Sequence, residues 1–219
     1  MCNKRWEFTG ETKIRFGITL RRIRAAVEFK LKCGIVIANG ELGGWIEKES
    51  NLSGNAWVSG DAMVSGDAMV CDNADVFGDA RVYGDAMVCG DADVFGDACV
   101  SGDSRVYGNA RVYDNARVYD RAEVSDSAVV FGDACVSGNA RVSGNAMVKS
   151  PKDYCVYKNT WSSFRWFTYT LSNKMWKVGC FYGTGAELIA KSYKDSEKSG
   201  KCYEAIVKAQ EAIEKAMEV

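Results

Sequence analysis

The chain has 219 residues, with 28 basic and 29 acidic side chains and no histidine. The missing histidine excludes Ser-His and Cys-His nucleophilic catalysis. Nine cysteines, an odd number without Cys-x-x-Cys spacing, predict reduced thiols rather than a disulfide framework. No apolar run has the length of a signal peptide core or a membrane span. These features predict a soluble, cytoplasmic protein with no membrane partner.

The charge is unevenly distributed along the chain. Residues 1–50 carry 10 basic and 6 acidic side chains, residues 51–150 carry 7 and 15, and residues 151–219 carry 11 and 8. The acidic middle argues against general nucleic-acid binding along its body. The only proline, Pro151, lies where a sequence repeat stops. We therefore divide the chain into units 1–45, 46–150 and 151–219.

Residues 1–45 predict a small β-rich cap. Apolar and polar residues alternate around Ile18 and Leu20 and again through 27–33, and Asn39-Gly40 is a strong turn signal. We expect Trp45 to plug the open end of the repeat that follows, because an uncovered terminal coil exposes strand edges. A cluster of three arginines at 21, 22 and 24 is interpreted as a solvated strand face rather than a phosphate-binding patch.

A repeat of six residues fills the stretch 46–148. An aliphatic residue recurs every sixth position from Ile46 to Val148, and a small residue follows each one after four positions, which gives 18 units. Such a period predicts a solenoid. Within a unit, alternation directs Ala and Val inward, and Gly followed by Asp or Asn makes the corner. Three units per coil predict six triangular coils, stacked roughly 4.8 Å apart.

This pattern resembles the hexapeptide-repeat superfamily, and the resemblance implies a left-handed parallel β-helix. The lead-in, EFTGETK at 7–13 and LGGWIEKESNLSGNA at 42–56, resembles that of hexapeptide-repeat proteins of phages and prophages, most of which have no known role. Acyltransferases of the superfamily use a histidine base, and its carbonic anhydrases bind zinc through histidines, so neither mechanism has its key residue in this chain. We expect no enzyme activity, no catalytic residue, no cofactor and no metal.

Outward side chains give each face of the solenoid its own character. Residues eighteen apart share a column, so one face should carry an aromatic ladder, which we interpret either as a contact surface or as a stack that stabilises its strands. One coil also presents an Arg and a Tyr on each of its three sides, a pair common in binding hot spots. The candidate partner-binding residues are Phe77, Phe95, Arg105, Tyr107, Arg111, Tyr113, Arg117, Tyr119 and Phe131.

Two other columns could hold a metal ion. Aspartates line two of the corners, and Cys71 and Cys89 share a column. We favour turn-forming aspartates over a calcium site. Stacked thiols are likewise favoured over a zinc site.

Residues 151–219 predict a ββαα module. Two strands, 165–170 and 175–181, are joined by a hairpin-type connection. Thr184 to Glu187 is a capping box that begins a helix, Ser199-Gly200 should end it, and an amphipathic second helix should follow. Its apolar face is predicted to contain Tyr203, Ile206, Val207, Ile213, Ala216 and Met217.

A glycine-rich turn, 179–185, joins the second strand to the first helix. Backbone amides at a helix start can hold an anion, so this turn is a weak candidate for binding a nucleotide-like ligand. A turn that only caps and packs the helix is favoured. The ligand-binding candidates are Arg165, Lys177, Gly183, Thr184 and Gly185.

The leading hypothesis is a non-catalytic protein-interaction module, encoded by a phage or prophage and acting in the host cytoplasm. It would bind, and could inhibit, a host protein such as a defence component. A second copy of the chain is the other candidate partner, and we expect a homo-oligomer. Two alternatives are a small anionic ligand binder and an acyltransferase-like protein without the usual histidine.

Overall fold

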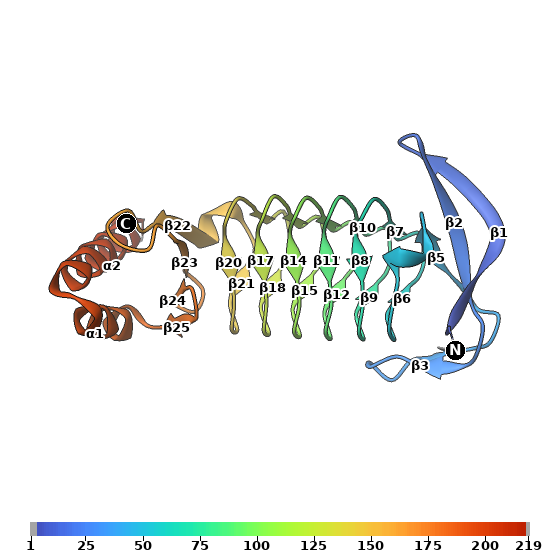
Figure 1. The fold of residues 1–219 in the computed structure, drawn as a ribbon, viewed down its shortest axis with the longest axis horizontal. Coiled ribbons are helices and arrows are strands. Elements are labelled where there is room, and N and C mark those ends of the chain that lie inside the picture. Colours follow the sequence, from blue (N-terminus) through green and yellow to red (C-terminus); the bar gives the residue numbers. More distant parts are fainter. Residues whose placement is uncertain (1–3, 218–219) are drawn as a thin grey trace.

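The computed structural model describes residues 4–217 and shows an elongated molecule. A solenoid rod forms the middle, a two-stranded hairpin unit covers one end, and a module with two helices covers the other (Figure 1). Within residues 4–217, neither helix is both long enough and apolar enough to cross a lipid bilayer.

The rod is built from three sheets whose strands within the coils, β6 to β21, are two residues long and wind around a common axis. The six-stranded sheet contains β6 (Trp57–Val58), β9 (Asp75–Val76), β12 (Asp93–Val94), β15 (Arg111–Val112), β18 (Val129–Val130) and β21 (Met147–Val148). The five-stranded sheet contains β8 (Met69–Val70), β11 (Met87–Val88), β14 (Arg105–Val106), β17 (Glu123–Val124) and β20 (Arg141–Val142). The eight-stranded sheet contains β1 (Trp6–Arg15), β2 (Ile18–Ala25), β5 (Leu42–Ile46), β7 (Met63–Val64), β10 (Arg81–Val82), β13 (Cys99–Val100), β16 (Arg117–Val118) and β19 (Cys135–Val136).

The register confirms the predicted coil. Arg81 pairs with Cys99, and Cys99 pairs with Arg117, so parallel partners are eighteen residues apart. The valines of these strands are fully buried, as are nearly all the alanines two positions before them. The mainly β fold, with about six coils, therefore follows from the six-residue period and from inward Ala and Val.

Glycines at the corners adopt a positive φ, for example 69° at Gly96. At four corners an aspartate stands in the glycine position with a φ near 60°: Asp72, Asp114, Asp120 and Asp126. Each of the four carboxylates accepts a hydrogen bond from the glycine N–H one coil further along, at 3.0 to 3.2 Å. Asp tolerates the left-handed conformation, and these bonds use its side chain to join coils.

The N-terminal unit extends the rod instead of standing apart from it. Strand β2 pairs antiparallel with β1 and with β5, and β5 pairs in parallel with β7, so the eight-stranded sheet runs from the hairpin into the coils. A second hairpin, β3 (Phe29–Lys30) with β4 (Val36–Ile37), packs Phe29 edge-on against Trp57 at 5.2 Å between ring centres. Trp6, Ile23 and Ile37 belong to the same buried cluster as the rod valines.

Two expectations for this unit are wrong. Trp45 does not plug the coil: it pairs with Met63 in an outward column, and its ring lies beneath the Lys13 ammonium at 4.1 Å. It lies outside the core cluster, because Trp45 directly precedes the inward Ile46, and adjacent residues of a strand point to opposite faces. The alternating stretch 27–33 forms only the two-residue strand β3, and Val27 is exposed.

The C-terminal module contains both predicted strands, flanked by two that the sequence did not reveal. The sheet order is β22 (Tyr154–Lys158), β23 (Trp166–Thr170), β24 (Met175–Val178) and β25 (Phe181–Gly183). The helices α1 (Gly185–Asp195) and α2 (Glu197–Met217) pack on it, and the Thr184–Glu187 capping box is present. Phe167, Trp176, Leu188, Tyr203 and Val207 form a separate core.

Details of the second helix differ from the prediction. The break comes at Ser196, and Gly200 lies inside α2, where a Cβ would collide with the Tyr193 ring. Ile213 and Met217 are exposed, whereas Gln210 is buried and accepts a hydrogen bond of 2.5 Å from the Tyr157 hydroxyl. Glycine therefore serves close packing here, and a satisfied amide replaces the expected apolar contact.

Candidate binding surfaces

The predicted aromatic ladder lies on the outer face of the six-stranded sheet. Phe77 stacks on Phe95 with 4.7 Å between ring centres, Phe95 on Tyr113 with 4.8 Å, and Tyr113 on Phe131 with 5.4 Å. Neighbouring rings are within 19° of parallel. The Arg111 guanidinium lies 5.4 Å from the Phe95 ring centre and 5.5 Å from that of Tyr113. We call this surface the ladder face.

Stacking covers the flat sides of the rings but not their outer edges. Phe77 is 37% exposed, and the other three rings are half-buried. The stack therefore stabilises the strands and also presents a continuous apolar strip to the outside. Such a strip, four coils long, is typical of a contact surface.

The coil with three Arg-Tyr pairs distributes them over three different sheets. Arg105 belongs to β14, Arg111 to β15 and Arg117 to β16. The pairs lie at the same level of the rod, as predicted, but on different sides. One flat partner cannot contact all three, so Tyr107 and Tyr119 do not extend the ladder face.

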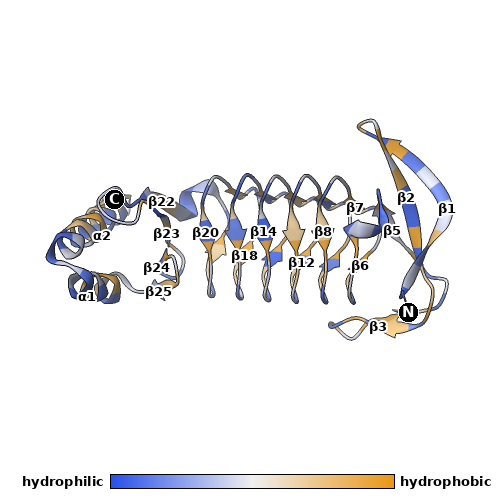
Figure 2. Ribbon diagram, viewed as in Figure 1, coloured by the Kyte–Doolittle hydropathy of each residue, from blue (hydrophilic) through white to orange (hydrophobic). Residues whose placement is uncertain are grey.

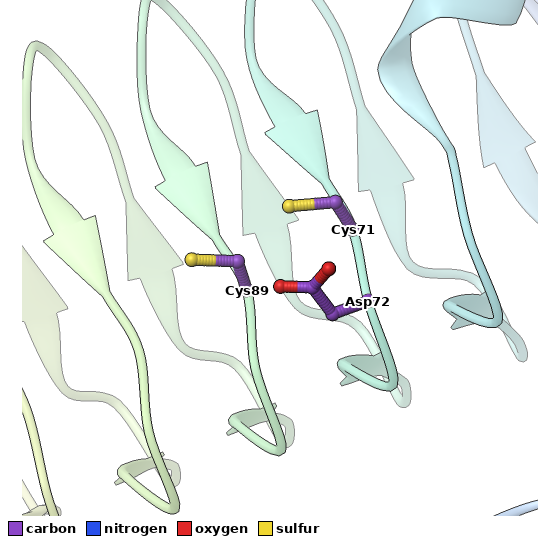
Figure 3. A group of neighbouring side chains, drawn as sticks. All are labelled: Cys71, Asp72 and Cys89. Atoms are coloured by element: carbon purple, nitrogen blue, oxygen red, sulfur yellow. The ribbon is translucent and has the colours of Figure 1, made fainter.

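Cys71, Asp72 and Cys89 form a cluster with metal-ligating chemistry, shown in Figure 3. Their donor atoms all lie within 4.8 Å of one another. Burial raises the pKa of the Cys71 thiol to about 12, so the protonated form is favoured. Asp72 is already engaged, since its carboxylate accepts the Gly90 N–H at 3.0 Å. The cluster offers two thiols and one partly occupied carboxylate, which is an incomplete ligand set for zinc.

A half-buried ion pair joins the N-terminal unit to the rod. The Lys32 ammonium lies 2.7 Å from an Asp93 carboxylate oxygen and donates to the Asp91 and Ala92 carbonyls. Asp75, one coil away, is 6% exposed, and one of its carboxylate oxygens is buried without a hydrogen-bond partner among the described residues. Burial raises the pKa of Asp75 to about 6, with Lys32 opposing the shift.

In the glycine-rich turn before α1, a side chain of the helix already binds the polar groups of Thr184. The Glu187 carboxylate accepts the Thr184 N–H at 2.8 Å and the Thr184 hydroxyl at 2.9 Å. These bonds lower the pKa of Glu187. A Cβ on Gly185 would meet Val207, and one on Gly183 would meet Phe181, so both glycines lie at close packing contacts.

The charged candidates do not converge on this turn. The Lys177 ammonium lies over the Tyr182 ring at 6.0 Å, and Arg165 lies near Gly179, whereas Thr184 is exposed at the helix start. The arrangement favours helix capping and packing over an anion site. Ligand binding by these residues stays a prediction.

Sequence reasoning missed the tip of the β1–β2 hairpin. Ile14 is 72% exposed and Phe16 is 82% exposed, and Phe16 faces the outer side of the rod across a cleft. Hydrophobic and hydrophilic residues alternate along β2, whereas β1 is mostly hydrophilic except near the tip (Figure 2). An Arg-Phe-Gly turn between two alternating segments was the available signal.

Parallel coils, triangular winding and outward columns define a β-solenoid protein. In agreement, a family model described as "YdcK Beta solenoid repeat" matches residues 104–118 and 134–149. The two matched segments lie in the rod and cover a small part of the chain. No curated protein matches the chain.

Proposed function

We propose that the protein is a non-catalytic binding rod, which contacts a partner protein through the ladder face. The observation that carries this proposal is the stack of four aromatic rings with exposed edges on one side of a rigid support. Backbone pairing between coils fixes the ring positions, so little side-chain entropy is lost on binding. Arg111, beside the rings, adds a residue type common in hot spots.

The partner is a host protein, and the setting is a phage or prophage gene product in a bacterial cytoplasm. The six-residue period and the lead-in, which resemble phage hexapeptide-repeat proteins, support this setting. Catalysis is disfavoured by the chemistry of the chain. It has no histidine, and the four aspartates in glycine positions are hydrogen-bonded to neighbouring coils.

Charge on the ladder face tests the proposal. The double variant Phe95→Asp, Tyr113→Asp should lose a partner that the immobilised wild type captures from bacterial extract, and should lose any self-association seen by light scattering. The control is Tyr107→Asp, which makes the same kind of substitution once, on the five-stranded sheet. Circular dichroism must show that both variants keep the rod. Equal capture by wild type and double variant would refute the ladder face as the binding surface.

A further inference from the structure

A cleft separates the β1–β2 hairpin from the outer face of the eight-stranded sheet. The hairpin leaves the rod at β5 and leans back over the first coils (Figure 1). The cleft has a volume of about 430 Å³, and Phe16, Ile18 and Leu20 form its hairpin wall. Met63 and Tyr83 form much of its rod wall. The walls are therefore largely apolar.

A small side chain keeps the cleft open. Ser65 and Tyr83 occupy the same outward column, one coil apart, and the column continues with Ser101 and Tyr119. A tyrosine at position 65 would fill the space beneath Phe16. Ser65 instead leaves a notch between Met63 and the Tyr83 ring.

Two arginines give the cleft its charge. Arg15 comes from the hairpin and Arg81 from the rod, and none of the described residues that line the cleft is acidic. Within residues 4–217, neither guanidinium makes an ion pair, and neither donates a side-chain hydrogen bond. The Tyr83 hydroxyl is engaged by the Cys99 thiol at 3.5 Å, which holds its ring at the edge of the cleft. The cleft thus combines apolar walls with two unneutralised cations.

Phe16 occupies a backbone position that other residues adopt more readily. Arg15 pairs with Ile18, so Phe16 and Gly17 form a two-residue turn, with φ values of 52° and 76°. Asn-Gly is the preferred sequence for such a turn, and a bulky residue at positive φ is strained. A side chain that is 82% exposed, on a residue with a strained backbone, contributes little to the fold of the free protein. Phe16 lies at the mouth of the cleft, where its exposed ring can contact a bound ligand.

We infer that this cleft binds an acidic peptide segment that carries a large apolar side chain. The apolar side chain enters between Phe16, Leu20 and Met63, and flanking carboxylates pair with Arg15 and Arg81. A nucleic-acid strand would extend beyond the cleft onto the rod, where 15 acidic side chains oppose 7 basic ones in residues 51–150. A short acidic peptide meets only the two arginines. The site lies on a different sheet from the ladder face, so it goes beyond the proposed function and can fail independently of it.

Fluorescence anisotropy with labelled octapeptides tests the inference on the full-length protein. The probe is Gly-Glu-Glu-Trp-Leu-Glu-Glu-Gly, and its two controls replace every Glu with Lys or replace Trp-Leu with Ser-Ser. We expect the acidic apolar probe to bind and both controls to bind at least about ten-fold more weakly. Arg15→Ala and Arg81→Ala should each weaken the probe about five-fold or more. Phe95→Asp on the ladder face should leave it unchanged.

Phe16→Asn separates recognition from folding. Asn suits the turn, so the variant should keep or raise the melting temperature while weakening the probe about five-fold or more. The matched control is Phe164→Asn, because Phe164 is also exposed, with a φ of 53°, but lies in the C-terminal module. It should leave probe binding unchanged.

Four results would overturn the inference. In the first two, the wild type does not bind the acidic apolar probe, or it binds the lysine control equally well. In the third, Arg15→Ala and Arg81→Ala bind the probe as tightly as the wild type does. In the fourth, a single-stranded oligonucleotide binds more tightly than the probe, and Arg81→Ala abolishes that binding. The last result would assign the arginines to a polyanion. A Phe16→Asn variant that binds the probe like wild type would remove Phe16 from the site.

Discussion

The two ends of the rod are covered in different ways. At the N-terminal end the backbone of β2 and β5 continues the eight-stranded sheet, and Trp6, Ile23 and Phe29 join the rod core. At the C-terminal end the module keeps its own core around Phe167 and Trp176. The first end is continuous with the rod, whereas the second is attached to it.

Side chains make the attachment at the C-terminal end. Backbone N–H groups of each coil donate to carbonyl oxygens of the next coil, as the Met63 N–H does to the Ala80 carbonyl. The last coil has no following coil, so its N–H groups need other hydrogen-bond acceptors. The Thr168 hydroxyl accepts the Arg141 N–H at 2.8 Å, and the Ser172 hydroxyl accepts the Met147 N–H at 2.8 Å. Covering the terminal edge prevents further strand pairing there. The two ends therefore differ: side-chain hydroxyls of the module can cap the last strands of the rod while the module and the rod keep separate hydrophobic cores.

Removing a central ring from the attached module should unfold that module alone. Phe167→Ala should cost about 3 to 5 kcal/mol, because Phe167 is fully buried in the separate core. Within residues 4–217 both α-helices belong to the module, so helical circular dichroism reports it selectively. We expect the helical signal to melt early while the rod signal keeps its wild-type midpoint. Loss of both signals together would show that the cores are coupled.

Removing a buried ring from the N-terminal end should destabilise the rod and the N-terminal unit together. Trp57→Ala should cost about 3 to 5 kcal/mol, because the buried Trp57 ring packs against Phe29 within the shared core. The rod and the N-terminal unit should melt together at a lower temperature. Amide hydrogen exchange of the N-terminal unit should follow the sheet signal, and an independent early opening of this unit would contradict the shared core.

Asp75 makes the continuous end sensitive to pH. Its folded-state pKa of about 6 lies above its ordinary value of 3.8, so the folded protein binds more protons in this window and stability falls as pH rises from about 4 to 6. Asp75→Asn should remove this fall and raise the free energy of unfolding at pH 7 by about 1 to 3 kcal/mol. Urea titrations at pH 4.5 and pH 7 measure it. Parallel pH dependence in wild type and variant would rule out Asp75 as the cause.

The smallest effect is expected at the hydroxyl contacts. Thr168→Val keeps the side-chain shape but leaves the Arg141 N–H without its acceptor, which should cost about 1 to 2 kcal/mol. Amide hydrogen exchange should speed up at Arg141. Exchange at Arg105, which bonds to Ala122 inside the stack, is the internal control and should stay slow.

The rod could be predicted from the sequence in detail because its interactions repeat. Every Val has the same neighbours eighteen residues away, so one local pattern specifies the burial, the register and the ladder of Phe77 to Phe131. Nothing repeats at the ends. The plug expected of Trp45 is wrong because the first outward column is covered from outside by Lys13 and Arg22.

The missed features depend on contacts between distant segments. The cleft needs the hairpin to lean over Ser65 and Tyr83, and no local pattern fixes that angle. Gly200 is a typical helix breaker in sequence, but in the fold it admits the Tyr193 ring. The sequence analysis did not single out the aspartates that stand in glycine positions, at 72, 114, 120 and 126, and their bonds to the next coil became visible only with the stacking in place.

Side-chain footprinting of the captured complex tests the central claim, that the ladder face contacts a partner, most directly. Hydroxyl radicals label exposed aromatic edges, so Phe77 and Phe95 should be modified in the free protein and protected in the complex. Tyr107, on the five-stranded sheet, should be labelled equally in both. Unchanged labelling of Phe77 and Phe95 in a complex that protects other residues would contradict the claim and would place the partner elsewhere on the rod.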